Sequence, residues 1–366
     1  MKIMTIVGAR PQFIKAAVIS RAIIEFNKNT SGQTIKELIV HTGQHYDYNM
    51  SKAFFDELDI PEPHYNLHIG GGSHGEQTGK MIEKIESVLL DNKPDWLLVY
   101  GDTNSTLAGA LAASKLHIPI AHIEAGLRSF NKKMPEEINR ILTDHVSTKL
   151  FCPTQTAVSN LHAENITKGI ELVGDVMYDC ALYYSDKVKP EMNRIISNFR
   201  LKEKSYYLAT LHRPVNTDNM DRLQSILHAF DEIASPEYPV FLPLHPRTKL
   251  KIKKFALSNS PYVFIAEPVS YLQMVALEKN AKIILTDSGG MQKEAYFHRV
   301  PCLTLREETE WIETVENGWN TLVGSDTVAI LSAVNKLESA DRALPYNDSL
   351  YGTGESAVRI LEKIIE

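Results

Sequence analysis

Three carboxylates in the N-terminal half of the chain are candidates for acid–base chemistry. Glu124 ends an apolar run and precedes Ala-Gly, a place where folding alone gives no reason for a charge. Asp102 follows another apolar run and Glu136 follows a proline at a predicted helix start, so helix capping also explains these two. If the strand ends converge, the three side chains share one pocket. Crowded carboxylates have pKa values pushed apart, which lets one act as a base and another as an acid.

Two cations near the N-terminus are candidates for binding an anion. Arg10 and Lys15 lie in the segment GARPQFIK, in which Pro11 is typical of the first turn of a helix. Positive charges at a helix N-terminus oppose the helix dipole, so an anionic ligand explains them more easily than stability does. Two solvated side chains are the alternative. The segment lacks the GxGxxG spacing of a dinucleotide fingerprint, which disfavours a nicotinamide-dependent dehydrogenase.

The segment Asp287-Ser288-Gly289-Gly290 in the C-terminal half has the composition of a phosphate-binding turn. It follows an apolar run and precedes a predicted helix, whose free amides attract phosphate, and its glycines let a ligand approach the backbone. Ser288 supplies a hydroxyl to the same group, and Glu294 can accept hydrogen bonds from ribose hydroxyls. An ordinary helix N-cap is the alternative interpretation.

His212 opens a similar turn in the same half, in the sequence His212-Arg213-Pro214. Histidine can donate to a diphosphate or titrate near neutral pH, so both roles are open for it. A metal site is not expected, because neither an HExxH pair nor a CxxC knuckle occurs. No Walker loop or GxSxG nucleophile elbow occurs either.

The elements that position these residues are short apolar runs that alternate with helical stretches. Such alternation predicts an α/β fold with parallel sheets covered on both faces, and it fits two doubly wound domains better than one barrel. Helices are expected at residues 105–115, 221–233, 291–298 and 355–366. The predicted strands are residues 3–7, 37–41, 96–100, 118–123, 149–151, 171–173, 206–211, 240–244, 263–265, 283–286 and 302–305.

Composition bounds the class of protein. The 366 residues suggest two domains, and 43% hydrophobic with 23% charged residues is typical of a globular chain. A net charge of −6 without a basic block disfavours nucleic-acid binding. Three widely spaced cysteines exclude a disulfide framework, and no apolar run reaches the ~18 residues of a membrane helix. The apolar stretch before Arg10 is too short for a signal peptide, so a cytoplasmic protein is expected.

Taken together, the motifs resemble the non-hydrolysing UDP-N-acetylglucosamine 2-epimerases, with blocks in the family's order and at its spacing along nearly the whole chain. The resemblance implies two Rossmann-like doubly wound domains that face a cleft, as in GT-B glycosyltransferases. The expected domains are residues 1–173 with 352–366 and residues 174–351, because the C-terminal helix crosses back to the N-terminal domain. The blocks are GARPQFIKAA, TGQHYDYNMS, GDTNSTLAGALAA, HIEAGLRS, MPEEINR, LHRPVNTD, LPLHPRT and LTDSGGMQKEA.

The resemblance also implies roles for individual residues. The family's essential acidic residues fall on Asp102, Glu124 and Glu136, and Tyr271 lies in a loop that resembles its uridine-side segment. The allosteric site that one branch of the family uses for a second UDP-N-acetylglucosamine falls in part on Gln44 and His45. The other substrate contacts fall on Arg10, Lys15, His212, Ser288, Gly289, Gly290 and Glu294.

The implied reaction is inversion of carbon 2 by elimination of UDP to a 2-acetamidoglucal and re-addition, without a cofactor, in the supply of surface-polysaccharide precursors. The family implies a homodimer. Three features depart from the best-known branch: Trp311 stands where that branch has an arginine, Val269 and Met274 replace residues near the uracil, and LHIGGGSHGEQTGKM is unlike its counterpart. The last segment and ETEW look more like a branch that includes epimerases of UDP-2,3-diacetamido-2,3-dideoxyglucuronic acid, which is the alternative substrate. A UDP-sugar glycosyltransferase, a hydrolysing epimerase and a nucleotide-sugar sensor are more distant alternatives.

Overall fold

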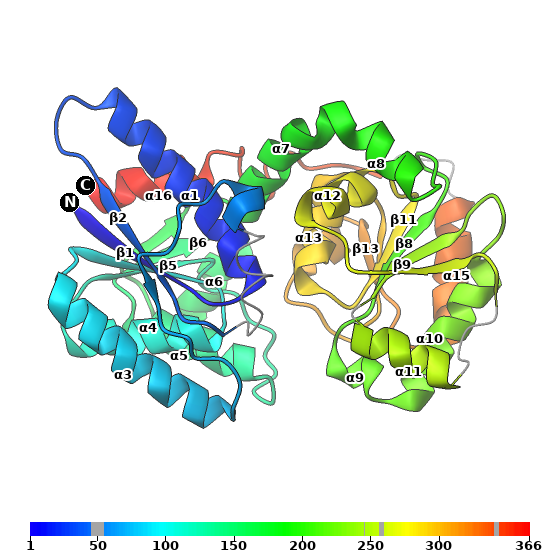
Figure 1. The fold of residues 1–366 in the computed structure, drawn as a ribbon, viewed down its shortest axis with the longest axis horizontal. Coiled ribbons are helices and arrows are strands. Elements are labelled where there is room, and N and C mark those ends of the chain that lie inside the picture. The colour runs from blue at the N-terminus through cyan, green and yellow to red at the C-terminus, as the bar shows by residue number, and fades with distance from the viewer. Residues whose placement is uncertain (45–54, 245, 256–259, 340–343) are drawn as a thin grey trace. The chain divides into compact units, whose positions relative to one another are not determined.

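The computed structural model describes residues 1–44, 55–244, 246–255, 260–339 and 344–366. It divides into two compact units, Met1–Cys180 with Asp348–Glu366, and Ala181–Asn347. Each unit is built on one parallel sheet with helices on both faces, which confirms the predicted α/β class (Figure 1). The domain boundaries placed from the sequence, after residue 173 and before residue 352, stay a prediction.

The first unit holds a parallel sheet whose order within the described residues is β3-β2-β1-β4-β5-β6-β7. The order runs outward from β1 in one direction and from β4 in the other, so the topological switch point lies between these two strands. The elements are β1 (Lys2–Val7), α1 (Arg10–Asn29), β2 (Lys36–His41), β3 (Tyr65–Asn66), α3 (His74–Asn92), β4 (Trp96–Tyr100), α4 (Asn104–Lys115), β5 (Ile120–Ile123), α5 (Pro135–Val146), β6 (Lys149–Cys152), α6 (Gln155–Ala163), β7 (Ile170–Leu172) and α16 (Ser356–Ile365), with α7 (Val176–Val188) running into the second unit.

Helices α3 and α4 cover one face of this sheet, and α1 and α16 lie together on the other (Figure 1). The apolar side of α16 is buried, and Ile360 and Leu361 are among its buried residues, together with Ile364. Burying two such side chains stabilises the unit by about 3–6 kcal/mol before the cost of ordering the helix. The last residues of the chain are therefore part of the core of the first unit.

The second unit holds a parallel sheet whose order within the described residues is β10-β9-β8-β11-β12-β13, so its switch point lies between β8 and β11. Helices α10 and α15 pack on one face and α12 and α13 lie on the other (Figure 1). The elements are a 3₁₀ turn (Lys189–Glu191), α8 (Met192–Asn198), β8 (Tyr207–Thr210), α9 (Pro214–Thr217), α10 (Met220–Ile233), β9 (Val240–Pro243), α11 (Pro246–Phe255), β10 (Val263–Ala266), α12 (Tyr271–Asn280), β11 (Ile283–Thr286), α13 (Gly289–Phe297), β12 (Cys302–Thr304), α14 (Ile312–Glu316), β13 (Asn320–Leu322) and α15 (Thr327–Glu338).

Candidate active site

A buried ion pair lies at the switch point of the first unit. Lys15, on the second turn of α1, donates to the carboxylate of Glu124, which follows β5, and both side chains are less than a tenth exposed. The pair packs on the α carbon of Gly101, which follows β4: a Cβ there would lie 3.0 Å from Lys15 Nζ and 3.2 Å from Glu124 Oε2. The positive φ of Gly101, 62°, also favours glycine. The end of β4 is thus shaped to admit this pair.

Asp102, the residue after Gly101, is held by a cation from α5. Its Oδ2 accepts a hydrogen bond from Arg140 Nη1 at 2.6 Å. Burial raises the pKa of Asp102 above its ordinary value; Arg140 and Lys15 oppose the rise, whereas the charges of Glu124 and Glu136 add to it. The structure therefore brings Lys15, Asp102, Glu124 and Glu136 into one electrostatic neighbourhood.

The two adjacent glutamates at the start of α5 differ in environment. Glu136 is exposed to solvent, whereas Glu137 is buried. The Glu137 carboxylate accepts from the amides of Ser129 and Phe130, each at 2.9 Å, and from Arg140 at 2.9 Å. Burial raises the pKa of Glu137, but these bonds outweigh it and hold the pKa below its ordinary value. Glu137 fixes the loop before α5, and Glu136 keeps a side chain available for a ligand.

The remaining first-unit candidates lie near the same strand ends. Arg10 is the first residue of α1, directly after the β1 turn. Gln44 follows β2, and its Oε1 accepts from Ser105 Oγ at 2.7 Å at the start of α4. His45, the other proposed allosteric residue, lies outside the described residues. Lys15 is paired with Glu124, so its place on α1 does not by itself require an anionic ligand.

His212 lies at the switch point of the second unit, after β8. Its Nδ1 is 2.9 Å from Oδ1 of the buried Asp287, which follows β11, and the ring is 57% exposed. The amides of His212 and Arg213 also donate to Asp287, at 3.1 Å each. Burial raises the pKa of Asp287, but the hydrogen bond and charge of His212, with these amides, hold it below its ordinary value. An ionised Asp287 thus orients the imidazole and leaves its other nitrogen facing outward.

The Ser288-Gly289-Gly290 turn begins helix α13. Ser288 is its N-cap, with Oγ accepting from Met291 N at 3.5 Å, so the capping interpretation is confirmed. A Cβ on Gly289 would lie 2.3 Å from Oε1 of Glu310, so the close approach at this glycine comes from the protein's own carboxylate. A Cβ on Gly290 would meet nothing within 4 Å. The open side of the turn is therefore at Gly290.

Three further side chains surround this turn. Tyr271, the first residue of α12, is buried and its hydroxyl lies 3.5 Å from Oε1 of Glu294 on α13. Trp311 is also buried, with the Lys293 ammonium 3.9 Å from its ring centroid. A cation over an aromatic face is an attractive contact, so Trp311 is held against α13. Glu294 on α13 is therefore in contact with Tyr271, and Trp311 packs on the same helix.

Arg140, Asp287 and His122 contact or hold the candidate residues and were not among the sequence candidates. The signal for Arg140 was its spacing of four residues from Glu136, which puts the two on one helix face. Asp287 was considered only as part of the glycine turn. A carboxylate at a strand end often orients a neighbouring histidine, and this was the signal that could have found it. His122 carried no signal, because a histidine in an apolar strand is usually a core residue.

Within the described residues, the structure shows no group of three or more His, Cys, Asp or Glu side chains arranged to hold a metal ion. Across the same residues, no helix is long and apolar enough to cross a membrane.

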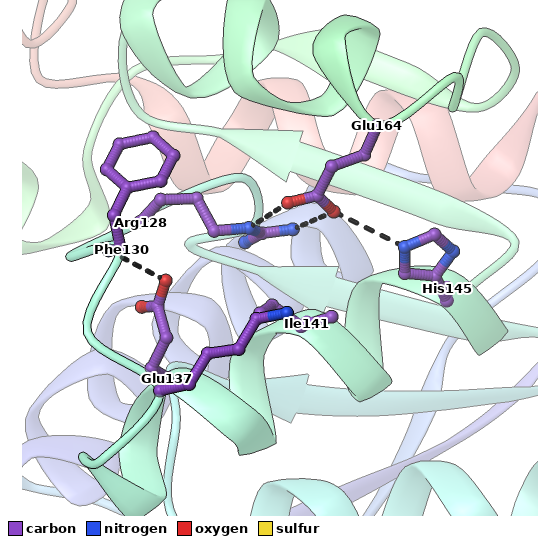
Figure 2. Close-up of a pocket in the computed structure, with 7 residues that line it drawn as sticks. Arg128, Phe130, Glu137, Ile141, His145 and Glu164 are labelled. Carbon is purple, nitrogen blue, oxygen red and sulfur yellow. Dashed lines mark hydrogen bonds and ion pairs between the residues drawn. The ribbon is translucent and has the colours of Figure 1, made fainter.

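A pocket of about 390 Å³ lies beside α5, and Glu137 is one of the residues that line it (Figure 2). Arg128 in its wall makes a bidentate ion pair with Glu164, at 2.6 and 2.8 Å, and Glu164 also meets His145 at 3.3 Å. The exposed Phe130 stands at the rim. None of the sequence candidates lines this pocket.

The family model described as UDP-N-acetylglucosamine 2-epimerase matches residues 27–365. The chain belongs to this family. It is therefore an epimerase, which confirms the family and the isomerase class expected from the sequence. This epimerase resembles solved members of the family along its whole length, which confirms the GT-B-like fold class.

Three similar proteins of the family carry names that differ in the sugar. The epimerase is 54% identical over 366 residues to a UDP-N-acetylglucosamine 2-epimerase homolog of Methanococcus maripaludis, covering 99% of each chain. It is 52% identical to the UDP-2,3-diacetamido-2,3-dideoxy-D-glucuronate 2-epimerase of Pseudomonas aeruginosa, again covering 99% of each. The crystal structure of the Methanocaldococcus jannaschii UDP-GlcNAc 2-epimerase in complex with UDP-GlcNAc and UDP has a TM-score of 0.89 and 46% identity, covering 100% of this chain and 99% of that one.

Proposed function

We propose that this epimerase interconverts UDP-N-acetylglucosamine and UDP-N-acetylmannosamine by eliminating and re-adding UDP. The observation that carries the proposal is the cluster of Asp102, Glu124 and Glu136 with Lys15 at the switch point of the first unit. The proton on carbon 2 is not adjacent to a carbonyl, so its removal needs a positioned base and a leaving group at carbon 1. A carboxylate takes this proton while the bond from carbon 1 to the diphosphate oxygen breaks, which gives UDP and a 2-acetamidoglucal.

The second half of the proposed reaction reverses these steps on the other face of carbon 2. A protonated carboxylate delivers a proton to the opposite face, and the diphosphate oxygen forms its bond to carbon 1 again. Asp102, Glu124 and Glu136 are the proposed acid–base residues, and burial raises the pKa of Asp102 above its ordinary value. Closure around the substrate keeps water away from the glucal.

The leaving UDP needs groups that hold its charge until it returns. We assign Arg10, Lys15 and His212 to the diphosphate, together with Ser288, Gly289 and Gly290 at the start of α13. The outward nitrogen of His212 and the open side of Gly290 support this assignment. Glu294 and Tyr271 are assigned to the nucleoside, and Gln44 with His45 to an allosteric UDP-sugar.

A second candidate substrate is UDP-2,3-diacetamido-2,3-dideoxyglucuronic acid. One observation favours it: the Pseudomonas aeruginosa relative named for this sugar is 52% identical, against 46% for the Methanocaldococcus jannaschii UDP-N-acetylglucosamine 2-epimerase. Both candidates share the acetamido group at carbon 2, so the same elimination serves either. A homodimer in the cytoplasm that supplies surface-polysaccharide precursors is part of the same proposal.

Proton NMR of the purified enzyme in deuterated water, with each UDP-sugar in turn, tests the proposal. Epimerisation places deuterium at carbon 2 and forms the manno-configured product, and the better substrate is the one with the higher kcat/KM. Glycosyl transfer would leave carbon 2 protonated, and accumulation of free UDP with free sugar would show a hydrolysing enzyme. Either result, or no turnover of either sugar, would contradict the proposal.

A further inference from the structure

A chain of paired ionisable side chains runs through the core of the first unit beneath the candidate carboxylates. His122, on β5, has its Nδ1 2.6 Å from Oδ1 of Asp144 on α5. The second oxygen of Asp144 accepts from Arg128 at 2.7 Å, and Arg128 continues to Glu164 at the pocket (Figure 2). The side chains of His122 and Asp144 are completely buried. Such groups are costly to bury unless each is paired, and here each of them has a hydrogen-bond partner.

Both ring nitrogens of His122 face oxygen atoms that can accept a hydrogen bond. Burial raises the pKa of Asp144, but the charges and hydrogen bonds of His122 and Arg128 outweigh it and hold the pKa below its ordinary value. Asp144 is therefore an acceptor for Nδ1. The other nitrogen, Nε2, faces the carbonyl oxygen of Gly101 at 2.8 Å, which is an acceptor in every protonation state.

These bonds end on the two turns that carry candidate catalytic residues. Gly101 immediately precedes Asp102, and its amide donates to Ile123 O at 3.0 Å. The backbone N–H and C=O of Gly101 are therefore both held by residues of β5. Gly126 follows Glu124 by two residues, and its amide donates to Asp144 Oδ2 at 3.1 Å. One buried pair therefore fixes both turns.

We propose that His122 is a positioning residue of the epimerase, which through its pair with Asp144 sets the relative placement of the Asp102 and Glu124 carboxylates. The inference rests on the proposed function of these two carboxylates. An error of about 1 Å in the placement of an acid or base costs about 100-fold in rate, so a clamp shared by both turns affects the chemical step more than binding.

Two substitutions separate the bonds of the ring. His122→Gln places its amide nitrogen near the position of Nε2 and keeps the bond to Gly101, whereas His122→Asn places its amide nitrogen near Nδ1 and keeps only the bond to Asp144. Ser20→Ala is a matched control for loss of a hydrogen bond in the same unit, because Ser20 donates to Glu37 at 2.7 Å, and Glu37 lies in the first half of β2.

Steady-state kinetics with the better UDP-sugar give the first readout. We expect His122→Asn to lower kcat by about 10- to 100-fold with KM changed less than about threefold, and His122→Gln to recover most of the loss. Ser20→Ala is expected to keep the wild-type kcat. Wild-type kcat in His122→Asn, or an equal loss in the two His122 variants, would overturn the inference.

Amide hydrogen exchange of the wild-type enzyme gives a readout that needs neither a variant nor activity. The amides of Gly101 and Gly126 are expected to exchange as slowly as those of the central strands β1 and β4, and His122→Asn to speed exchange around Gly101 when it folds. Fast exchange at both amides in the wild type would overturn the inference even if His122→Asn did not fold. A wild type with slow exchange but no turnover would instead contradict the proposed function alone.

Discussion

The Lys15 ammonium and the Glu124 carboxylate form a buried pair that rests on the α carbon of Gly101. The pair links the first helix to the ends of β4 and β5, so three segments far apart in the sequence meet at one point. The contact depends on the opposite charges of Lys15 and Glu124, and on the backbone conformation and missing side chain of Gly101. The charges and the glycine can be tested separately.

Gly101→Ala is expected to destabilise the first unit and abolish turnover. A left-handed conformation costs alanine about 1–2 kcal/mol, and the new methyl group would also displace the ion pair. Urea denaturation followed by fluorescence measures the loss. Gly79→Ala in α3 is the control, because a Cβ there meets nothing and alanine stabilises a helix interior by about 1 kcal/mol. Equal stability of the two variants would contradict the expectation.

Lys15→Met and Glu124→Gln are each expected to destabilise the enzyme by about 3–5 kcal/mol, because each removes the opposite charge that a buried partner contacts. The double variant is expected to lose less than the sum of the two, since no unpaired charge remains. A double-mutant cycle on the free energy of unfolding measures this coupling. Strictly additive losses would show that the pair contributes nothing specific.

Glu136→Gln and Glu137→Gln are a matched pair of neighbouring substitutions with opposite expected effects. Glu136 is exposed, so its variant should fold with wild-type stability and lose most of its turnover if Glu136 is catalytic. Glu137 holds the Ser129 and Phe130 amides and Arg140, so its variant should lose about 1–3 kcal/mol of stability. Thermal unfolding and deuterium incorporation at carbon 2 distinguish the two. A fully active Glu136→Gln would remove this residue from the mechanism.

Arg140→Gln is expected to move the pH profile of kcat/KM. Arg140 opposes the rise in the pKa of Asp102 that burial causes, so loss of its charge raises this pKa further. The limb of the profile that reports Asp102 should shift to higher pH whether the ionised or the protonated form is active. Arg140→Lys keeps the charge and is expected to shift the limb less. An unmoved profile in Arg140→Gln would mean that Asp102 does not control either limb.

Asp179→Asn is expected to change the pH dependence of stability. Asp179 on α7 accepts from Ala357 N at 2.8 Å, and burial raises its pKa to about 6. Because the folded pKa exceeds the unfolded value of about 3.9, the folded state holds the extra proton, and stability falls as pH rises from about 4 to 6. The asparagine variant lacks this decline. The free energy of unfolding of the variant, relative to that of the wild type, should therefore rise by up to about 3 kcal/mol between pH 4 and pH 7. A difference that does not vary with pH would contradict this expectation.

Most of the strands, and the strand ends that carry the candidate residues, could be predicted because they depend on local signals. The runs 96–100 and 283–286 were predicted with the bounds that β4 and β11 have, since each is a continuous apolar run ended by a polar residue. Two short strands were missed: β3 (Tyr65–Asn66) and β13 (Asn320–Leu322) contain polar residues, and only their neighbours make them strands.

Pairings between distant residues could not be predicted. Arg140 reaches Asp102 across 38 residues and Asp144 reaches His122 across 22, and a single sequence does not show which charge meets which. The same limit applies to Gly289, whose missing side chain was attributed to an approaching ligand, whereas Glu310 occupies that side. The residue types at strand ends were therefore informative, but their internal partners were not.

The packing of α16 on α1 has a consequence for biosynthesis. The ribosome synthesises the first 180 residues long before it synthesises α16, the helix that completes their core. During translation, the N-terminal unit waits with part of its apolar surface uncovered while the second unit is synthesised. Released chains that end just before residue 356 should consequently have a complete second unit and an unfinished first one.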